Sequence, residues 1–508
     1  MAIFPIYLAF AAARAVCLLL TPLVRTVALS WGLVDEPDGR RKMHARPIPI
    51  AGGVAVLLTV GVVLGGSFLW GGPWYEMVAG RWAMAVGLST AAVVIAVVGI
   101  ADDYRGMRGR TKLFWQLAAV IIVIASGVEV GGLRLFGHTI TFDRTFAILF
   151  TAAWLLGAIN SLNLIDGMDG LLGTLGCIIC SALAAMAFMN GHYHVAAIAA
   201  AMAGALLGFL CFNFPPATIF LGDCGSMLIG LVVGVLAIQS SLKGPATVAL
   251  TAPAALLIIP ILDTSGAIVR RKLTGRSVFT TDRGHLHHVL LRRGMSNRGV
   301  LLLVSGLCVI ASMAALFSLY INSDLLAALS ALGVVGVLVT FRLFGHAEFL
   351  LIKEQFLSFF FALRHGHEQG RVHESAVRLQ GSADWKDVWK QVTSTAEELQ
   401  LRAVTLDVNA PAMHEAYHAR WGRVPAEGET RSFWRAEIPL AVRGQIVGRI
   451  EVAGQYDGEP VGEKIAKASR VVEMVESALA GLTRPPAPFT LEGVKNSDQA
   501  TLEDAPVA

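Results

Sequence analysis

Acidic and histidine side chains interrupt an otherwise apolar chain in five short stretches. These are Ala101 to Tyr104 with the pair Asp102 and Asp103, Asn163 to Gly170, Phe220 to Asp223, Asp263 with the arginines after it, and His285 to His288. Carboxylates bind divalent cations, and basic side chains beside them neutralise phosphates. The residue types therefore indicate a metal-dependent site for phosphates, if the fold brings the stretches together.

Asp102 and Asp103 follow the apolar run 91–100. Two adjacent carboxylates repel each other unless a cation or a shared proton lies between them. A magnesium ion, or a proton to be transferred, would account for the pair. The alternative is that the basic residues after it, Lys112 among them, only neutralise the acids at the lipid headgroups.

Asn163, Asp166 and Asp169 are spaced three apart, which places them on one face if the segment is helical. Gly167 and Gly170 allow close backbone approach. Such a face can hold a ribose, a base edge or a hydrated magnesium ion. The alternative, a turn that caps the next span, leaves the repeated carboxylates unexplained.

Asp223 stands at the start of a predicted helix, between Gly222 and Gly225. It is either an ordinary N-cap or a magnesium ligand beside substrate phosphates. Phe220 is either a stacking face for a base or a core ring. For Asp38, Asp143 and Asp324, which are single acids at predicted helix ends, we prefer the role of a cap.

The longest basic loop carries His285, His287 and His288 together with Arg276 and Arg283. Arginines alone can set topology or bind anionic headgroups. Histidines are mostly neutral at pH 7 and serve those purposes poorly. We expect them to donate hydrogen bonds to a diphosphate whose charge the two arginines clamp. A zinc site lacks supporting cysteines, and carboxylates with phosphates favour a harder ion.

The elements that must position these residues are membrane helices. Hydrophobic residues make up 55% of the chain and charged residues 15%, with a mean hydropathy of +0.62. These values predict an all-α polytopic membrane protein. Eleven apolar segments lie near 3–30, 49–70, 83–101, 113–128, 145–162, 171–189, 194–212, 225–242, 247–269, 299–320 and 324–345.

Loop charge predicts the orientation of these spans. One alternate set of loops holds sixteen Lys and Arg residues, and the other set holds four. The positive-inside rule makes the first set cytoplasmic, which puts the N-terminus outside. All five stretches then face the cytoplasm, as does the region after the last span.

The composition changes after residue 345. We expect 1–345 to be the transmembrane domain, 346–365 an interfacial helix or linker, 366–482 a small soluble α+β domain, and 483–508 a disordered tail. The soluble domain has helical patterns at 385–399 and 460–482, a strand pattern at 403–408 and a hairpin of 433–442 with 445–453. The hairpin is faintly similar to that of GAF sensor domains.

Four of the motifs together carry a resemblance. Asp102-Asp103-Tyr104, Asn163 to Gly170, Phe220 to Ser226 and His285-Leu286-His287-His288, in this order, resemble the polyprenyl-phosphate N-acetylhexosamine-1-phosphate transferase family. That family includes the WecA, TagO and MraY enzymes. The resemblance covers about residues 1–345 and is closest to the WecA and TagO branch. The C-terminal domain is a departure, since many members end near their last span.

The resemblance implies a reaction and a set of roles. Family members join a UDP-N-acetylhexosamine to a polyprenyl phosphate and release UMP, and they require Mg²⁺. The implied metal ligand is Asp223, and Phe220 would stack on uracil. The residues expected in catalysis are Asp102, Asp103, Asp166, His285, His287 and His288. Those expected to bind substrate are Lys112, Asn163, Asp169, Phe220, Arg276 and Arg283.

The substrate and partners follow from the same resemblance. The interrupted histidine motif argues against the muramoyl-peptide substrate of the MraY branch, so N-acetylglucosamine is our first choice. The lipid partner is undecaprenyl phosphate in a bacterial inner membrane, and no nucleic acid is expected. The C-terminal domain is expected to regulate, form a homodimer or recruit later glycosyltransferases. Two other interpretations remain, a membrane transporter and a membrane-tethered sensor that acts through the C-terminal domain.

Overall fold

The helices of the first part of the chain follow the apolar segments of the sequence. The computed structural model describes residues 3–36, 47–71, 81–244, 247–274, 284–353, 356, 374–380, 385–410, 415–422, 433–442, 444–456 and 460–482. It divides into two units, Met1–Phe349 and Leu350–Ala508. The helices of the first unit are α1 (Ile3–Ser30), α2 (Gly52–Trp70), α4 (Trp82–Arg105), α5 (Gly109–Ala125), α6 (Arg144–Ile165), α7 (Leu171–Met189), α8 (Tyr193–Asn213), α9 (Gly222–Ser240), α10 (Thr251–Leu256), α11 (Ile258–Leu273), α12 (Leu286–Arg292), α13 (Asn297–Tyr320) and α14 (Asp324–Thr340).

Eight of the described helices are long and apolar enough to cross a membrane, namely α1, α2, α4, α6, α7, α8, α9 and α13. The sequence predicts eleven spans, and α5, α11 and α14 occupy the other three at only 17, 16 and 17 residues. The prediction of one continuous helix over 247–269 is wrong, because the chain breaks into α10 and α11 at Leu257. Pro260 has no N–H for the carbonyl of Leu256, and its ring would clash with it.

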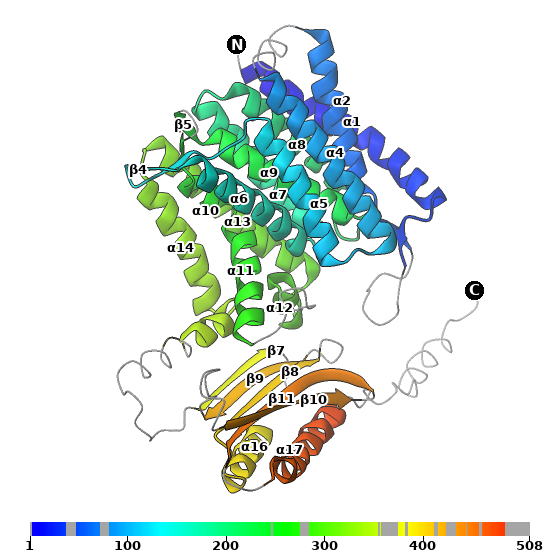
Figure 1. Ribbon diagram of the computed structural model, residues 1–508. Helices are drawn as coiled ribbons and strands as arrows, with labels where there is room; N and C mark the ends of the chain where they lie inside the picture. The colour runs from blue at the N-terminus through cyan, green and yellow to red at the C-terminus, as the bar shows by residue number, and fades with distance from the viewer. Residues whose placement is uncertain are drawn as a thin grey trace, which may run out of the picture. The chain divides into compact units, whose positions relative to one another are not determined.

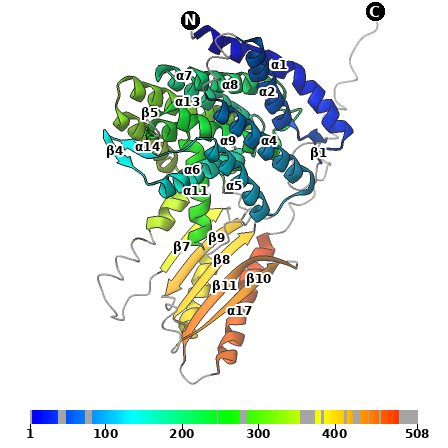
Figure 2. The ribbon, with the colours of Figure 1, turned by 45° about the horizontal axis from the view of Figure 1, so that its top comes forward.

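α9 is the central helix of this unit. Every side chain from Cys224 to Ser240 is buried, and α9 contacts α2, α4, α6, α7 and α8. The buried share of the span is 89%, against 22% for α1 at the periphery. A helix surrounded on all sides is apolar all round instead of amphipathic. Figures 1 and 2 show the other helices around it, with α1 and α14 on opposite sides.

Glycines allow the helices to touch backbone to backbone. A Cβ at Gly53 of α2 would overlap the backbone of Gly225, and one at Gly99 of α4 would overlap the backbone of Cys224. Gly204 of α8 lies in the same way against the carbonyl of Phe10 in α1. Small residues at such crossings are typical of membrane helix packing.

Short strands, which the sequence analysis did not predict, tie the helix ends together. β1 (Val34–Asp35) pairs with β2 (Ile48–Pro49). A second sheet has the order β4-β3-β6-β5, formed by β3 (Gly132–Leu135), β4 (His138–Thr141), β5 (Leu242–Gly244) and β6 (Thr247–Val248). Just after β2, Ile50 forms a bridge with Phe220. This bridge fixes the chain immediately before α9.

The three predicted caps have different outcomes. Asp143 caps α6, where its Oδ2 accepts from the N–H groups of Thr145 and Phe146. Asp324 was predicted to cap α14, but its Oδ2 accepts from the N–H of Phe136 in the turn between β3 and β4. Asp38 lies outside the described residues.

The second unit is an antiparallel five-stranded sheet with two helices on one face (Figure 1). The strand order is β10-β11-β8-β9-β7, formed by β7 (Glu374–Gln380), β8 (Ala403–Ala410), β9 (Glu415–Gly422), β10 (Phe433–Val442) and β11 (Gln445–Gln455). The helices are α16 (Lys386–Glu398) and α17 (Val461–Leu482). Both helices, the strand at 403–408 and the hairpin of β10 and β11 are where the sequence predicts them. β7 and β9 were not predicted.

The predicted class is confirmed, an all-α polytopic membrane protein with a small C-terminal α+β region. Residues 346–353 are helical, and most of the predicted interfacial segment beyond them lies outside the described residues. The tail 483–508 also lies outside them. The likeness to GAF domains stays a prediction.

Gly204→Ala should destabilise the first unit. Its new methyl group would meet the Phe10 carbonyl and force α1 and α8 apart, and overpacking of this kind costs about 1–3 kcal/mol. The matched control is Gly61→Ala in α2, where a Cβ has nothing within 4 Å. We expect a lower melting temperature in detergent for Gly204→Ala alone. Equal melting temperatures would contradict the close α1–α8 crossing.

Candidate active site

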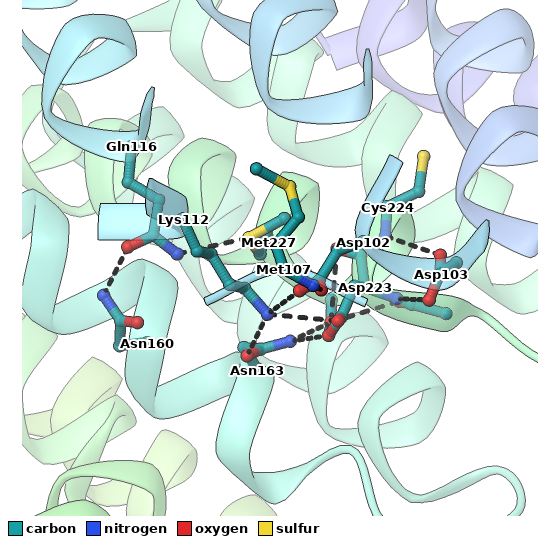
Figure 3. A network of polar contacts seen from close by, with 12 residues as sticks. Asp102, Asp103, Met107, Lys112, Gln116, Asn160, Asn163, Asp223, Cys224 and Met227 are labelled. Atoms are coloured by element: carbon teal, nitrogen blue, oxygen red, sulfur yellow. Dashed lines mark hydrogen bonds and ion pairs between the residues drawn. The ribbon is translucent and has the colours of Figure 1, made fainter. Parts of the chain in front are cut away.

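A lysine joins two carboxylates at one end of the helices (Figure 3). Lys112, in the first turn of α5, places Nζ 2.9 Å from Oδ2 of Asp102 and 3.1 Å from Oδ2 of Asp223. Asn163, in the last turn of α6, accepts from Nζ at 3.2 Å and donates to Oδ1 of Asp223 at 2.5 Å. The side chain of Asp223 is 31% exposed and that of Asp102 is 11% exposed. Asp223 is therefore the more open of the two carboxylates.

Asp103 has a different task from its neighbour Asp102. Its Oδ1 accepts from the N–H of Asp223 at 2.9 Å, and its Oδ2 accepts from the N–H of Cys224 at 3.3 Å. These are free donors at the start of α9, where a negative charge is also favourable. Asp103 thus caps α9 from another helix. The side chain of Asp223 makes no cap and turns to Lys112 and Asn163, which rejects the ordinary N-cap alternative.

The spacing of Asn163, Asp166 and Asp169 predicts a shared face if the segment is helical. In the structure the three residues do not share one. α6 ends at Ile165, and the chain turns from Asp166 to Gly170, which has a positive φ of 73°. Asn163 alone lies in the helix. The expectation fails because a backbone turn containing two glycines interrupts the helical period.

Asp169 joins two loops of the site. Its Oδ2 accepts from the N–H of Ala217 at 2.9 Å. Nearby, Asn213 accepts from the N–H of Gly170 at 3.1 Å and donates to the carbonyl of Ile219 at 2.9 Å. Hydrogen bonds therefore fix the loop after α6 and the loop before α9 to each other. Phe220 is partly buried in the second of these loops, three residues before Asp223.

Asp166 lies in a strongly acidic surrounding. Burial raises the pKa of its carboxyl well above the usual value, and the negative charges of Asp223, Asp103 and Asp169 raise that pKa further. A positive charge bound beside these acids would relieve the repulsion.

The histidine motif reaches the same loop. His287 is buried, and its ring occupies the place that a Cβ of Gly167 would need. Burial lowers the pKa of His287 well below its usual value, and the nearby His288 and His285 lower it further. The His287 and His288 ring centroids are 4.2 Å apart. His287 is therefore neutral at pH 7, in agreement with a hydrogen-bonding role.

The structure brings together four of the five stretches at this site. Lys112 joins Asp102 to Asp223, and direct contacts link Asp103 to Asp223, Asn163 to Asp223 and Gly167 to His287. Arg276 and Arg283 lie outside the described residues, so their predicted role stays a prediction. Ser226, named above only as the end of a motif, also belongs to the site, since its Oγ lies 2.8 Å from Nδ2 of Asn163. The sequence analysis gave Asp263 no role, although a single acid within an apolar run is a signal.

The donor set fits a hard divalent cation. Asp102 and Asp223 both reach one ammonium group within 3.1 Å, so the two carboxylates already converge on a single positive charge. Within the described part of the chain, no group of three or more His, Cys, Asp and Glu side chains could hold a metal. Magnesium often uses only one or two carboxylates and completes its shell with water and substrate phosphates.

Comparisons with known proteins find a matching family and several relatives. The family model for glycosyl transferase family 4 matches residues 85–241. A probable undecaprenyl-phosphate N-acetylglucosaminyl 1-phosphate transferase of Bacillus subtilis is 32% identical over 300 residues, which cover 59% of this chain and 81% of that protein. A decaprenyl-phosphate N-acetylglucosaminephosphotransferase of Mycobacterium tuberculosis is 35% identical over 348 residues, covering 62% and 83%.

Fold and site together define a polytopic membrane protein with an acidic, lysine-bridged centre at the ends of its helices. The chain belongs to the polyprenyl-phosphate N-acetylhexosamine-1-phosphate transferase family, within glycosyl transferase family 4, as its loop motifs predict.

Asp103→Asn should lower stability, because asparagine has one acceptor oxygen for the two N–H groups of α9. We expect a loss of about 1 kcal/mol, the usual value for a helix cap. Asp143→Asn is the matched control, since Asp143 caps α6 through a single oxygen that asparagine keeps. The melting temperature in detergent should fall for the first variant and stay unchanged for the second. An unchanged value for both would show that Asp103 is not needed as a cap.

Proposed function

We propose that the protein transfers N-acetylglucosamine-1-phosphate from UDP-N-acetylglucosamine to undecaprenyl phosphate and releases UMP. The observation that carries the proposal is the Lys112-bridged pair of Asp102 and Asp223, joined to the histidine motif through Gly167. The names of the relatives support the acceptor lipid and the sugar phosphate. The reaction would be the first membrane step of a cell-surface polysaccharide, at the cytoplasmic face of the bacterial inner membrane.

The position of the acids favours this reaction over a transport pathway. Asp102 lies in the last turn of α4, and Asp223 lies in the first turn of α9. A transport pathway would need ionisable groups deeper between the helices. At helix ends, a water-soluble nucleotide sugar can meet a lipid phosphate whose tail stays in the bilayer.

The transfer exchanges one phosphate bond for another. An oxygen of the lipid phosphate attacks the β-phosphorus of the donor and forms a new P–O bond. The bond from that phosphorus to the oxygen shared with the α-phosphate breaks, and UMP leaves with this oxygen. Such a reaction needs positioning and charge neutralisation more than covalent chemistry.

The residues of the chain divide these tasks. Lys112 neutralises the acids and is placed to attract a phosphate. Asn163 fixes the positions of Lys112 and Asp223 through a hydrogen bond to each. Asp102 is the member of the adjacent pair that faces Lys112. We therefore assign the deprotonation or positioning of the lipid phosphate to Asp102 and not to Asp103. Neutral His287 and its neighbour His288 would donate hydrogen bonds to the diphosphate.

Magnesium is the implied cofactor, and Asp223 with Asp102 would hold it. When bound, the ion neutralises the charge that develops on the phosphate oxygens. Without it, Lys112 keeps the two carboxylates from repelling each other.

Purified protein should release UMP from UDP-N-acetylglucosamine only when undecaprenyl phosphate and Mg²⁺ are present. Asp223→Asn keeps the size of the side chain and removes its charge, so we expect a loss of at least about a hundredfold in turnover. Asp143→Asn, which lies at the other end of α6, should turn over like the wild type. Failure of folded wild-type protein to release UMP from any UDP-N-acetylhexosamine would refute the proposal.

Magnesium should also stabilise the protein without any substrate. A concentration ten times the dissociation constant contributes about 1.4 kcal/mol. We expect Mg²⁺ to raise the melting temperature of the wild type and of Asp143→Asn, and EDTA to reverse the rise. In Asp223→Asn the rise should be absent. A rise of equal size in that variant would place the ion elsewhere.

A further inference from the structure

One buried carboxylate outside the Lys112 cluster contacts the histidine motif. Asp263 of α11 is fully buried, with 0% of its surface exposed. Its Oδ2 lies 2.8 Å from Nδ1 of His285, and its Oδ1 accepts from the N–H of Leu286 at 2.7 Å. A buried charge costs several kcal/mol unless it is paired and hydrogen-bonded. Both oxygens of Asp263 are satisfied by the histidine segment.

The contact to the N–H of Leu286 is a structural one. His285 is the N-cap residue of α12, and its side chain makes no cap. Oδ1 of Asp263 takes over this task for the first N–H of the helix. The contact to the His285 ring is additional, because capping α12 does not require it.

The contact to the ring decides which nitrogen of His285 is available. A carboxylate accepts, so Nδ1 must carry the proton. Nε2 is then the atom that can meet a ligand, as an acceptor when the ring is neutral and as a donor when it is protonated. An oriented imidazole of this kind depends on its carboxylate for both tautomer and direction.

The ring of His285 belongs to the proposed site. It lies 6.3 Å from the His287 ring, centroid to centroid, and the planes differ by 8°. His287 in turn packs against Gly167, in the loop that carries Asp166. Two nearly parallel histidine rings therefore lie beside the acidic centre, and Asp263 contacts the ring of His285.

We propose that Asp263 is a positioning residue for the transfer reaction. It fixes His285 with the proton on Nδ1, so that Nε2 is presented as an acceptor to a hydroxyl or N–H donor of the sugar nucleotide. This inference rests on the proposed function. Asp263 itself touches neither substrate nor metal, and it acts through His285.

Asp263→Asn separates this role from the structural one. Asparagine has one acceptor oxygen, which can keep the hydrogen bond from the N–H of Leu286. The imidazole, in contrast, can move its proton to Nε2 and accept at Nδ1 from the new amide. The variant should therefore fold but present the wrong tautomer. Thr264→Val, the next residue in α11, is the control, because the buried Oγ1 of Thr264 has no hydrogen-bond partner among the described residues.

The test is a double-mutant cycle in the UMP release assay, with melting temperatures measured in parallel. The four proteins are wild type, Asp263→Asn, His285→Ala and the double variant. We expect Asp263→Asn to lower kcat at least about tenfold, with KM for the lipid phosphate unchanged, and Thr264→Val to have no effect. In the His285→Ala background the same substitution should change kcat by less than about twofold. Equal losses in both backgrounds, or a wild-type kcat for Asp263→Asn, would overturn the positioning role.

A second variant keeps the test independent of how Asp263→Asn folds. His285→Asn offers an amide donor near the position of Nδ1 and has no atom at the position of Nε2. It should melt like the wild type and turn over as slowly as His285→Ala. Wild-type turnover in His285→Asn would overturn the inference while leaving the proposed function intact. Absence of turnover in the wild type itself would overturn both.

Discussion

The N–H groups at the start of α9 need an acceptor, and the carboxylate of Asp103 in α4 supplies it. α9 is the most buried span of the described chain, so its free N–H groups have few other partners. Because Asp103 caps the helix, Asp223 does not have to, and its carboxylate is left for Lys112 and for a ligand. The reactive centre thus depends on a structural hydrogen bond between two helices, formed by residues that are 120 positions apart in sequence.

This cap is possible only where α4 and α9 touch. Gly99 faces the backbone of Cys224 without a side chain between them, and Gly53 gives α2 the same access. A Cβ at Gly222 would also overlap Asp103, and this glycine has a positive φ of 71°. The acids therefore reach these positions only because the helices pack this closely. This close packing explains why glycines surround the carboxylates in the sequence.

The histidine segment is held by α11 from the other side. Besides Asp263, the buried guanidinium of Arg270 packs against Gly284 and forms an ion pair with Glu348. Glu348 lies two residues before the start of the second unit. The chain that leads to the C-terminal α+β unit is thus fastened to the helix that positions the motif. Regulation, dimer formation and recruitment of other enzymes all remain expectations for that unit.

The sequence alone determined the membrane class, most helix positions and the motifs that carry the chemistry. These are local properties, since about 20 apolar residues predict a span wherever they occur, and the family likeness rests on ordered motifs. Prediction from the sequence failed where tertiary contacts override the local pattern. The turn after Ile165 separates Asn163 from Asp169, Pro260 divides a predicted span, and the short strands pair segments far apart in the chain. Which of two adjacent aspartates caps a helix and which faces Lys112 was decided only by the fold, because identical side chains acquire different partners from the helices packed against them.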